Sequence, residues 1–173
     1  MNVARPVADE IPPHFVGYIS KVTESDPVAV LASQIDVTAG LLRGLSEADA
    51  LKRYAPGKWS VKEVVGHLAD TERIMGYRAL RIARADETPL PGFDENAYVP
   101  PAKFDDRSLD ALIADFRTVR AATLALFKSF DADAWLRRGT ASGKPVSVRA
   151  IGYMIPGHER HHVEILKDRY GLR

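Results

Sequence analysis

Four stretches of the chain repeat apolar residues at alternating intervals of three and four, which is the period of an amphipathic helix. This pattern predicts helices over roughly 28–44, 61–84, 108–130 and 147–170. Each stretch begins beside a residue type that caps helix N-termini, and these residues are Asp26, Ser60, Ser108 and Ser147. The signal is strongest at Ser60, because Glu63 follows three residues later and completes a capping box. We therefore predict an all-α protein built as a four-helix bundle.

The longest connection between two predicted helices is the proline-rich stretch 86–106, which has no helical periodicity. Fully extended, this linker would reach on the order of 65 Å. A helix of about 24 residues is only about 36 Å long. The chain can therefore cross back to the other end of the bundle, so that the third helix runs parallel to the second.

Three local features complete the predicted fold, which we expect to be a single domain over 1–173. Prolines break residues 1–26 into an irregular arm, from which Phe15, Tyr18 and Ile19 could dock on a neighbour. Residues 131–146 leave room for a short extended piece. Pro156 lies inside the fourth predicted helix and is expected to kink it or widen it locally.

Two histidines on the fourth predicted helix form the most informative chemical pattern. His158 and His162 are four residues apart, so they share one side of a helix, on a stripe that is otherwise mostly apolar. His161 falls at the edge of that stripe. His67 lies on the inward face of the second predicted helix, and it reaches the same height as the pair if these two helices are antiparallel. Three neutral imidazoles at one level would suit one divalent ion, such as Zn, Ni or Fe, with a coordination position left open.

Other interpretations of these histidines stay open at the level of sequence. Buried histidines are most often hydrogen-bonded core residues, and His67 would miss the pair if the two helices were parallel. The letters His-Glu-x-x-His of zinc proteases also fit residues 158–162. That class normally has a strand-rich neighbouring subdomain and a further ligand downstream, whereas only eleven residues follow His162 here. Glu159 points about 100° away from His158, which makes it a poor general base.

Several polar residues could surround such a site. Glu63 and Asp70 lie four residues before and three residues after His67, so either carboxylate could orient its ring, although both could equally be a cap and surface charge. The loops at this end of the bundle are expected to form the rim of a pocket. Their candidate residues are Trp59, Asp94, Glu95, Asn96 and Tyr98, with simple solvation of a loop as the alternative for the linker residues.

The composition of the chain argues against several classes of ligand and metal site. The chain has 24 basic and 23 acidic residues, interspersed, which does not favour binding to nucleic acid or to an anionic membrane. It has no cysteine, so any metal site must use histidine, carboxylate or water. No apolar run is long enough to span a membrane, and the first residues do not form a signal peptide, so we expect a cytoplasmic protein.

Taken together, these residues resemble the DinB-like superfamily, and within it the YfiT-type metal-dependent hydrolases. The resemblance covers nearly the whole chain and is carried by Tyr54–Asp70, which contains the run Gly-Lys-Trp-Ser before His67, by Glu72, Arg73 and Arg78, and by Gly157–His162. It implies an up-down-down-up bundle with a long crossover between helices 2 and 3. It also implies that His67, His158 and His162 bind one divalent metal ion, and that the protein forms a homodimer.

The resemblance implies an enzyme that acts on a small-molecule substrate, but it leaves two reactions open. One is hydrolysis, and the other is transfer of a low-molecular-weight thiol, which would then be a second cofactor. The alternative is a non-enzymatic metal- or ligand-binding bundle, in which an exposed aromatic arm around Phe15 and Tyr18 serves dimerisation.

Overall fold

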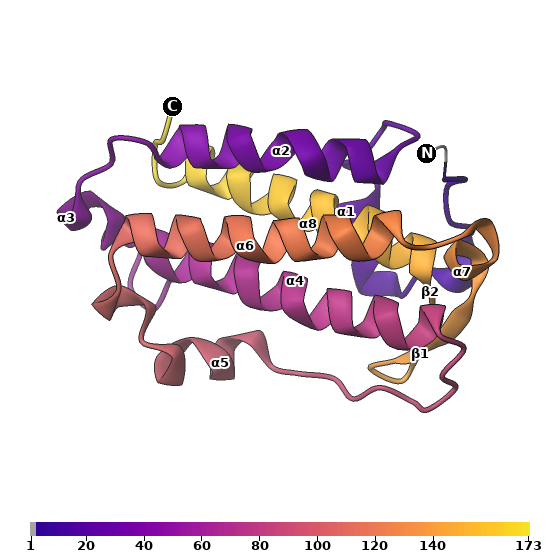
Figure 1. The fold of residues 1–173 in the computed structure, drawn as a ribbon. Coiled ribbons are helices and arrows are strands. Elements are labelled where there is room, and N and C mark those ends of the chain that lie inside the picture. The colour runs from indigo at the N-terminus through magenta and orange to yellow at the C-terminus, as the bar shows by residue number, and fades with distance from the viewer. Residues whose placement is uncertain (1–2) are drawn as a thin grey trace.

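The computed structural model describes residues 3–173, and four long helices form its body (Figure 1). They are α2 (Pro27–Leu42), α4 (Val61–Ala83), α6 (Leu109–Lys128) and α8 (Val148–Asp168). In the ribbon α4 and α6 run in one direction, and α2 and α8 run in the other. The bundle is therefore up-down-down-up, as predicted. Among the long helices, α2 contacts α6 and α8, and α4 also contacts α6 and α8.

The predicted start signals are confirmed at all four helices. The side chain of Asp26 accepts hydrogen bonds from two backbone N–H groups of α2, and Ser108 and Ser147 each accept one from α6 and α8. At α4 the capping box is complete, because Ser60 Oγ accepts from the Glu63 N–H and the Glu63 carboxylate accepts from the Ser60 N–H. These bonds satisfy N–H groups that have no partner within a helix.

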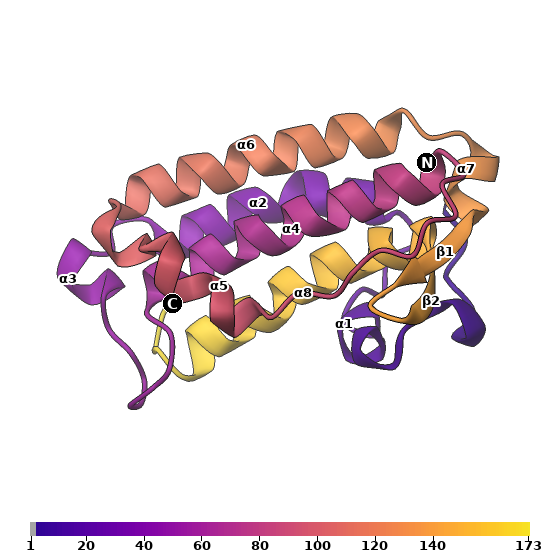
Figure 2. The same cartoon turned by 90° about the horizontal axis from the view of Figure 1, so that it is seen from below.

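The linker 86–106 is not structureless, so that prediction was wrong in part. It contains α5 (Glu95–Ala102) and a short 3-10 helix, Phe104–Asp106. Asp94 begins α5 by accepting from the N–H groups of Asn96 and Ala97. Pro100 and Pro101 lie in the last turn of α5, where their missing N–H groups remove backbone hydrogen bonds, and the helix ends soon afterwards. The rest of the linker runs back along the bundle in an extended form (Figure 2).

The N-terminal arm is also more ordered than predicted. It contains 3-10 helices at Ala8–Glu10 and Pro13–Phe15, followed by the single-turn α1 (Val16–Ile19), which packs along α8. Phe15 and Ile19 are buried in the core of their own chain. The idea of an exposed aromatic arm for dimerisation is therefore wrong for Phe15, because its ring is already covered.

The remaining short elements lie at the two ends of the bundle (Figure 1). At one end is α3 (Glu47–Ala50). At the other end are α7 (Ala132–Leu136) and an antiparallel hairpin of β1 (Arg138–Ala141) and β2 (Lys144–Ser147), which is the short extended piece that the sequence predicted. Leu90 of the linker pairs with Ala141 of this hairpin. The helix α8 continues through Pro156, whose carbonyl accepts a hydrogen bond of 3.0 Å from Gln34. Within residues 3–173, no helix is both long and apolar enough to cross a membrane.

A buried ion cluster joins the four long helices at the centre of the bundle. The guanidinium of Arg120 on α6 donates to Glu72 on α4 and to Glu159 on α8, with nitrogen–oxygen distances of 2.8 Å for both carboxylates. Its third arm donates to the carbonyl of Leu31 on α2 at 2.9 Å. Thr38, also on α2, donates to Glu159. Arg120 is only 1% exposed, so this charge depends on these partners.

We expect Arg120→Met to lower the free energy of unfolding by about 3–5 kcal/mol, because two buried carboxylates would lose their cation. Urea unfolding of the two proteins measures the difference. The control is Arg117→Met on the same helix, where an exposed arginine pairs with the exposed Asp36. That change should cost less than about 1 kcal/mol. Equal losses in the two variants would contradict this role for the cluster.

Candidate metal centre

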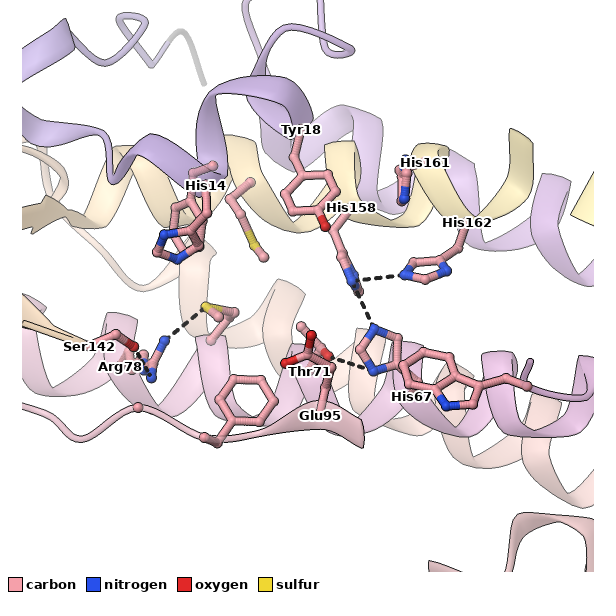
Figure 3. Close-up of a pocket in the computed structure, with 16 residues that line it drawn as sticks. His14, Tyr18, His67, Thr71, Arg78, Glu95, Ser142, His158, His161 and His162 are labelled. Carbon is pink, nitrogen blue, oxygen red and sulfur yellow. Dashed lines mark hydrogen bonds between the residues drawn. The ribbon is translucent and has the colours of Figure 1, made fainter. Parts of the chain in front are cut away.

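Three imidazoles meet in the interior between α4 and α8 (Figure 3). The Nε2 atom of His158 lies 3.0 Å from Nε2 of His67 and 3.2 Å from Nε2 of His162. All three rings are buried, and their potential ligand atoms lie within 4.8 Å of one another. The structure therefore brings together the three histidines that the sequence singled out.

The antiparallel course of α4 and α8 explains this meeting. His158 and His162 are one turn apart on α8, so their rings project from one side. His67 lies two turns into α4, and the antiparallel packing brings it to the level of the pair. His161 falls outside the cluster: its half-buried ring packs edge-on against Tyr18, with 5.3 Å between ring centroids.

The chemistry of the donor set fits a cation. A neutral imidazole nitrogen either donates one proton or accepts one, so His158 Nε2 cannot form two good hydrogen bonds to its two neighbours at once. A metal ion would instead take one lone pair from each Nε2 atom. Bonds of about 2.1 Å place two such nitrogens roughly 3.0–3.4 Å apart. The observed separations of 3.0 and 3.2 Å agree with that range.

Burial also keeps these rings in the protonation state that a metal needs. It lowers the pKa of His67 from 6.5 to about 4. Burial, together with the neighbouring imidazoles, holds the pKa of His158 and of His162 well below the usual value. All three are therefore neutral at pH 7, and a neutral imidazole is the form that binds metal.

Aromatic side chains enclose the three rings. The indole of Trp59 lies 4.7 Å from the His67 ring and 6.4 Å from the His162 ring, measured between centroids. Tyr18 packs edge-on against His158 at 5.2 Å. This contact requires glycine at position 157, because a Cβ atom there would lie 2.0 Å from the Tyr18 carbonyl oxygen. The Gly157 position therefore lets α1 lie directly against α8 and form one wall of the site.

A cavity of about 400 Å³ extends from the three histidines toward the hairpin. Figure 3 shows His67, His158 and His162 at one end of the cavity and Arg78 with Ser142 at the other, where His14 also lies. Tyr18, Thr71 and Glu95 lie between the two ends. A volume of this size suits a small organic molecule.

The predicted rim residues lie in different places. Trp59 and Glu95 line the main cavity. Asn96 lines a neighbouring cavity of about 210 Å³ that also touches Trp59 and His162. Tyr98 lines a narrow space beside His67. Asp94 was predicted at the rim, and this prediction was wrong. Its carboxylate caps the N-terminus of α5 by accepting hydrogen bonds from two backbone N–H groups.

The two carboxylates expected to orient His67 are occupied elsewhere. Glu63 accepts from Arg53 and from the Ser60 N–H, and Asp70 accepts from Arg73. The group nearest to His67 Nδ1 is instead the hydroxyl of Thr71, at 3.4 Å. Arg53 from the loop before α4 binds Glu63, and Arg73 on α4 itself binds Asp70. Thr71 therefore takes the place beside His67 that we expected Glu63 or Asp70 to fill.

Sequence reasoning did not assign several residues of the cavity to the site, among them Thr71, Arg78 and Tyr18. Thr71 follows His67 by four residues and was predicted on the same face of this helix, but it was taken as part of the apolar stripe. Arg78 follows His67 by eleven residues, so helical spacing could have placed it on that face as well. Tyr18 had no such signal, because its position depends on how α1 packs against α8.

Comparisons with known proteins find relatives along most of the chain. The family model described as DinB superfamily matches residues 31–166. A "putative metal-dependent hydrolase" of Bacillus licheniformis is 30% identical over 128 residues, which span 71% of this chain and 71% of that protein. A second "putative metal-dependent hydrolase", from Oceanobacillus iheyensis, is 33% identical over 58 residues, or 33% of each chain.

One solved structure matches over 100% of both chains with a TM-score of 0.72 and 20% sequence identity. It is YfiT from Bacillus subtilis, described as "a probable metal-dependent hydrolase with an unusual four-helix bundle topology". At this level of identity the match concerns the fold.

The buried neutral histidines predict how the stability of the metal-free protein depends on pH. The pKa of His67 is about 4 in the folded chain and 6.5 for a free side chain, so between these values only the unfolded chain binds the proton. Stability should therefore fall as pH decreases from 7.5 to 5, by about 2 kcal/mol for His67 alone. Urea unfolding in the presence of a chelator measures this change.

The variant His67→Gln provides the control for this pH dependence. It should lose about 2 kcal/mol less than the wild type between pH 7.5 and 5, because that titration is removed. A wild-type stability that stays constant or rises over this interval would contradict the assignment of buried neutral imidazoles.

Proposed function

This chain belongs to the DinB superfamily, and on that premise we propose that it is a metal-dependent hydrolase of a small molecule. His67, His158 and His162 would hold one divalent ion, for which Zn, Ni and Fe are the candidates. The observation that carries this proposal is the convergence of three buried, neutral Nε2 atoms at 3.0 and 3.2 Å. Hydrogen bonds among the three rings alone cannot give every Nε2 atom a partner.

When bound, the ion would supply a Lewis acid that lowers the pKa of a water molecule at the open end of the site. The side chains around it have separate tasks. Trp59 and Tyr18 cover the rings and limit solvent, which strengthens electrostatic interactions in the site. Burial raises the pKa of Tyr18, so its hydroxyl keeps its proton at pH 7 and can donate a hydrogen bond. Glu95 supplies a carboxylate on the facing wall that can accept a proton.

Transfer of a thiol is the second candidate, since it would use the same three ligands. The chain has no cysteine, so the thiol would have to come from a small molecule that enters the cavity. A bound divalent ion favours the thiolate over the thiol at neutral pH. A panel of esters, amides and thiol–electrophile pairs, assayed with the loaded protein, separates the two reactions. A loaded protein without activity on any of them would favour a bundle that only binds metal.

Metal content tests the ligand set directly. We expect the untagged protein to bind about one equivalent of Zn²⁺, Ni²⁺ or Fe²⁺, as measured by elemental analysis after dialysis. His67→Ala should weaken the uptake about tenfold to a hundredfold or more, because one of three ligands is lost.

His161→Ala is the matched control, since this histidine neighbours His162 in sequence but lies outside the cluster of ligand atoms. It should keep the wild-type stoichiometry and affinity. A wild-type protein that takes up none of these ions, or an equal loss in His67→Ala and His161→Ala, would show that the proposal is wrong.

A further inference from the structure

Arg78 is a buried cation at the end of the cavity away from the histidines. The residue is 4% exposed, and its guanidinium donates to the Pro91 carbonyl at 2.7 Å and to Ser142 Oγ at 3.1 Å. Its other contacts are the sulfur of Met75 and the face of the Phe93 ring, 5.7 Å from the guanidinium carbon to the centroid. All of these partners are neutral.

No carboxylate within residues 3–173 forms an ion pair with Arg78. The other deeply buried arginine, Arg120, has two carboxylate partners. A buried charge without a counterion is costly, and such charges in proteins are usually paired. The difference between these two arginines therefore calls for an anion that reaches Arg78 from the cavity it lines.

The guanidinium is held in position before any ligand arrives. Pro91 and Ser142 both bind Nη2, and Ser142 is itself fixed by a hydrogen bond from its N–H to the Leu90 carbonyl at 3.0 Å. Nε and the remaining Nη1–H have no acceptor among these contacts and stay available. A preorganised arginine loses less conformational entropy on binding an oxyanion than a free one does.

The spacing along α4 relates this end of the cavity to the histidines. His67, Thr71, Met75 and Arg78 follow one another on one face of the helix, and all four line the cavity. Eleven residues of helix rise by about 16 Å. Both side chains lean toward the N-terminus, so this lean leaves the axial separation unchanged, and only the greater length of the arginine side chain can bring its guanidinium closer to the imidazoles.

We propose that Arg78 and Ser142 form the binding site for a carboxylate of the substrate, whose other end reaches the three histidines. A carboxylate matches the single positive charge and the one hydroxyl that this end offers. A phosphate dianion would lack a second cation, and Glu95, which also lines the cavity, would repel it more strongly. This inference names a substrate class for the proposed metal site and rests on that proposal for the position of the reaction.

The first experiment needs no metal, so it remains informative if the metal proposal fails. Hexanoate and 1-hexanol are titrated into the metal-free full-length protein by calorimetry. We expect hexanoate to bind about tenfold more tightly than hexanol, or better, and Arg78→Gln to abolish the difference. Arg84→Gln is the charge-matched control, because this exposed arginine is the C-cap residue of the same helix and lies outside the cavity. It should leave the preference unchanged.

The variant Ser142→Gly tests the same site independently, so the proposal can still be judged if Arg78→Gln does not fold. Ser142 has φ 52°, a conformation that glycine adopts readily, so the loss of the hydroxyl should not strain the fold. It should weaken hexanoate binding several-fold and leave hexanol unaffected. Equal binding of hexanoate and hexanol by the wild type, or tighter Arg78-dependent binding of inorganic phosphate than of hexanoate, would overturn the proposal.

The second experiment links the two ends of the cavity. In the Co²⁺-loaded protein, sulfur-to-cobalt absorption bands report on 6-mercaptohexanoate and on the uncharged 6-mercaptohexanol of equal length. The carboxylate should favour the first by about tenfold in the wild type and not in Arg78→Gln, while Co²⁺ content stays equal in both. An equal affinity for the two thiols in the loaded wild type would contradict a substrate that spans from Arg78 to the histidines.

Discussion

The structure depends on the buried ion cluster at Arg120, because it couples the axial positions of all four long helices. Its guanidinium binds Glu72 on α4, Glu159 on α8 and the Leu31 carbonyl on α2. A shift of one helix along another would leave a buried charge unpaired, at a cost of several kcal/mol. Since Glu159 follows His158 directly, the same contacts that hold the register of α4 against α8 also hold the three histidines at one height.

The fixed positions of α4 and α8 bring the three histidines together at one end of the cavity. The Nε2 atoms meet within 3.2 Å of His158, in an interior where burial keeps the rings neutral. The rest of the cavity wall comes from segments far away in the sequence: α1 contributes Tyr18, the linker contributes Phe93 and Glu95, and the hairpin contributes Ser142. The bundle therefore supplies the rigid ligands, while the added segments shape the space where a substrate would bind.

The features that sequence could predict are local or periodic. Helix starts depend on a cap and its next three residues, and the inward face of a helix follows from its 3.6-residue period, which is why the histidines were found. The errors concern contacts between distant segments. Glu63 was matched to His67 by spacing, but Arg53 from the loop between α3 and α4 binds it. The α5 helix was hidden by its two prolines, and the docking of α1 depends on a close approach at Gly157 that no pattern announces.

We propose that three imidazoles, and no carboxylate, hold one divalent ion in this bundle. X-ray absorption spectroscopy of the Zn²⁺- or Ni²⁺-loaded full-length protein tests it most directly, because imidazole rings produce characteristic outer-shell scattering. We expect nitrogen ligands at about 2.0–2.1 Å with scattering from three imidazoles, the remaining ligands being light atoms from solvent. A spectrum with one imidazole or none, or one unchanged in the His67→Ala variant, would contradict it.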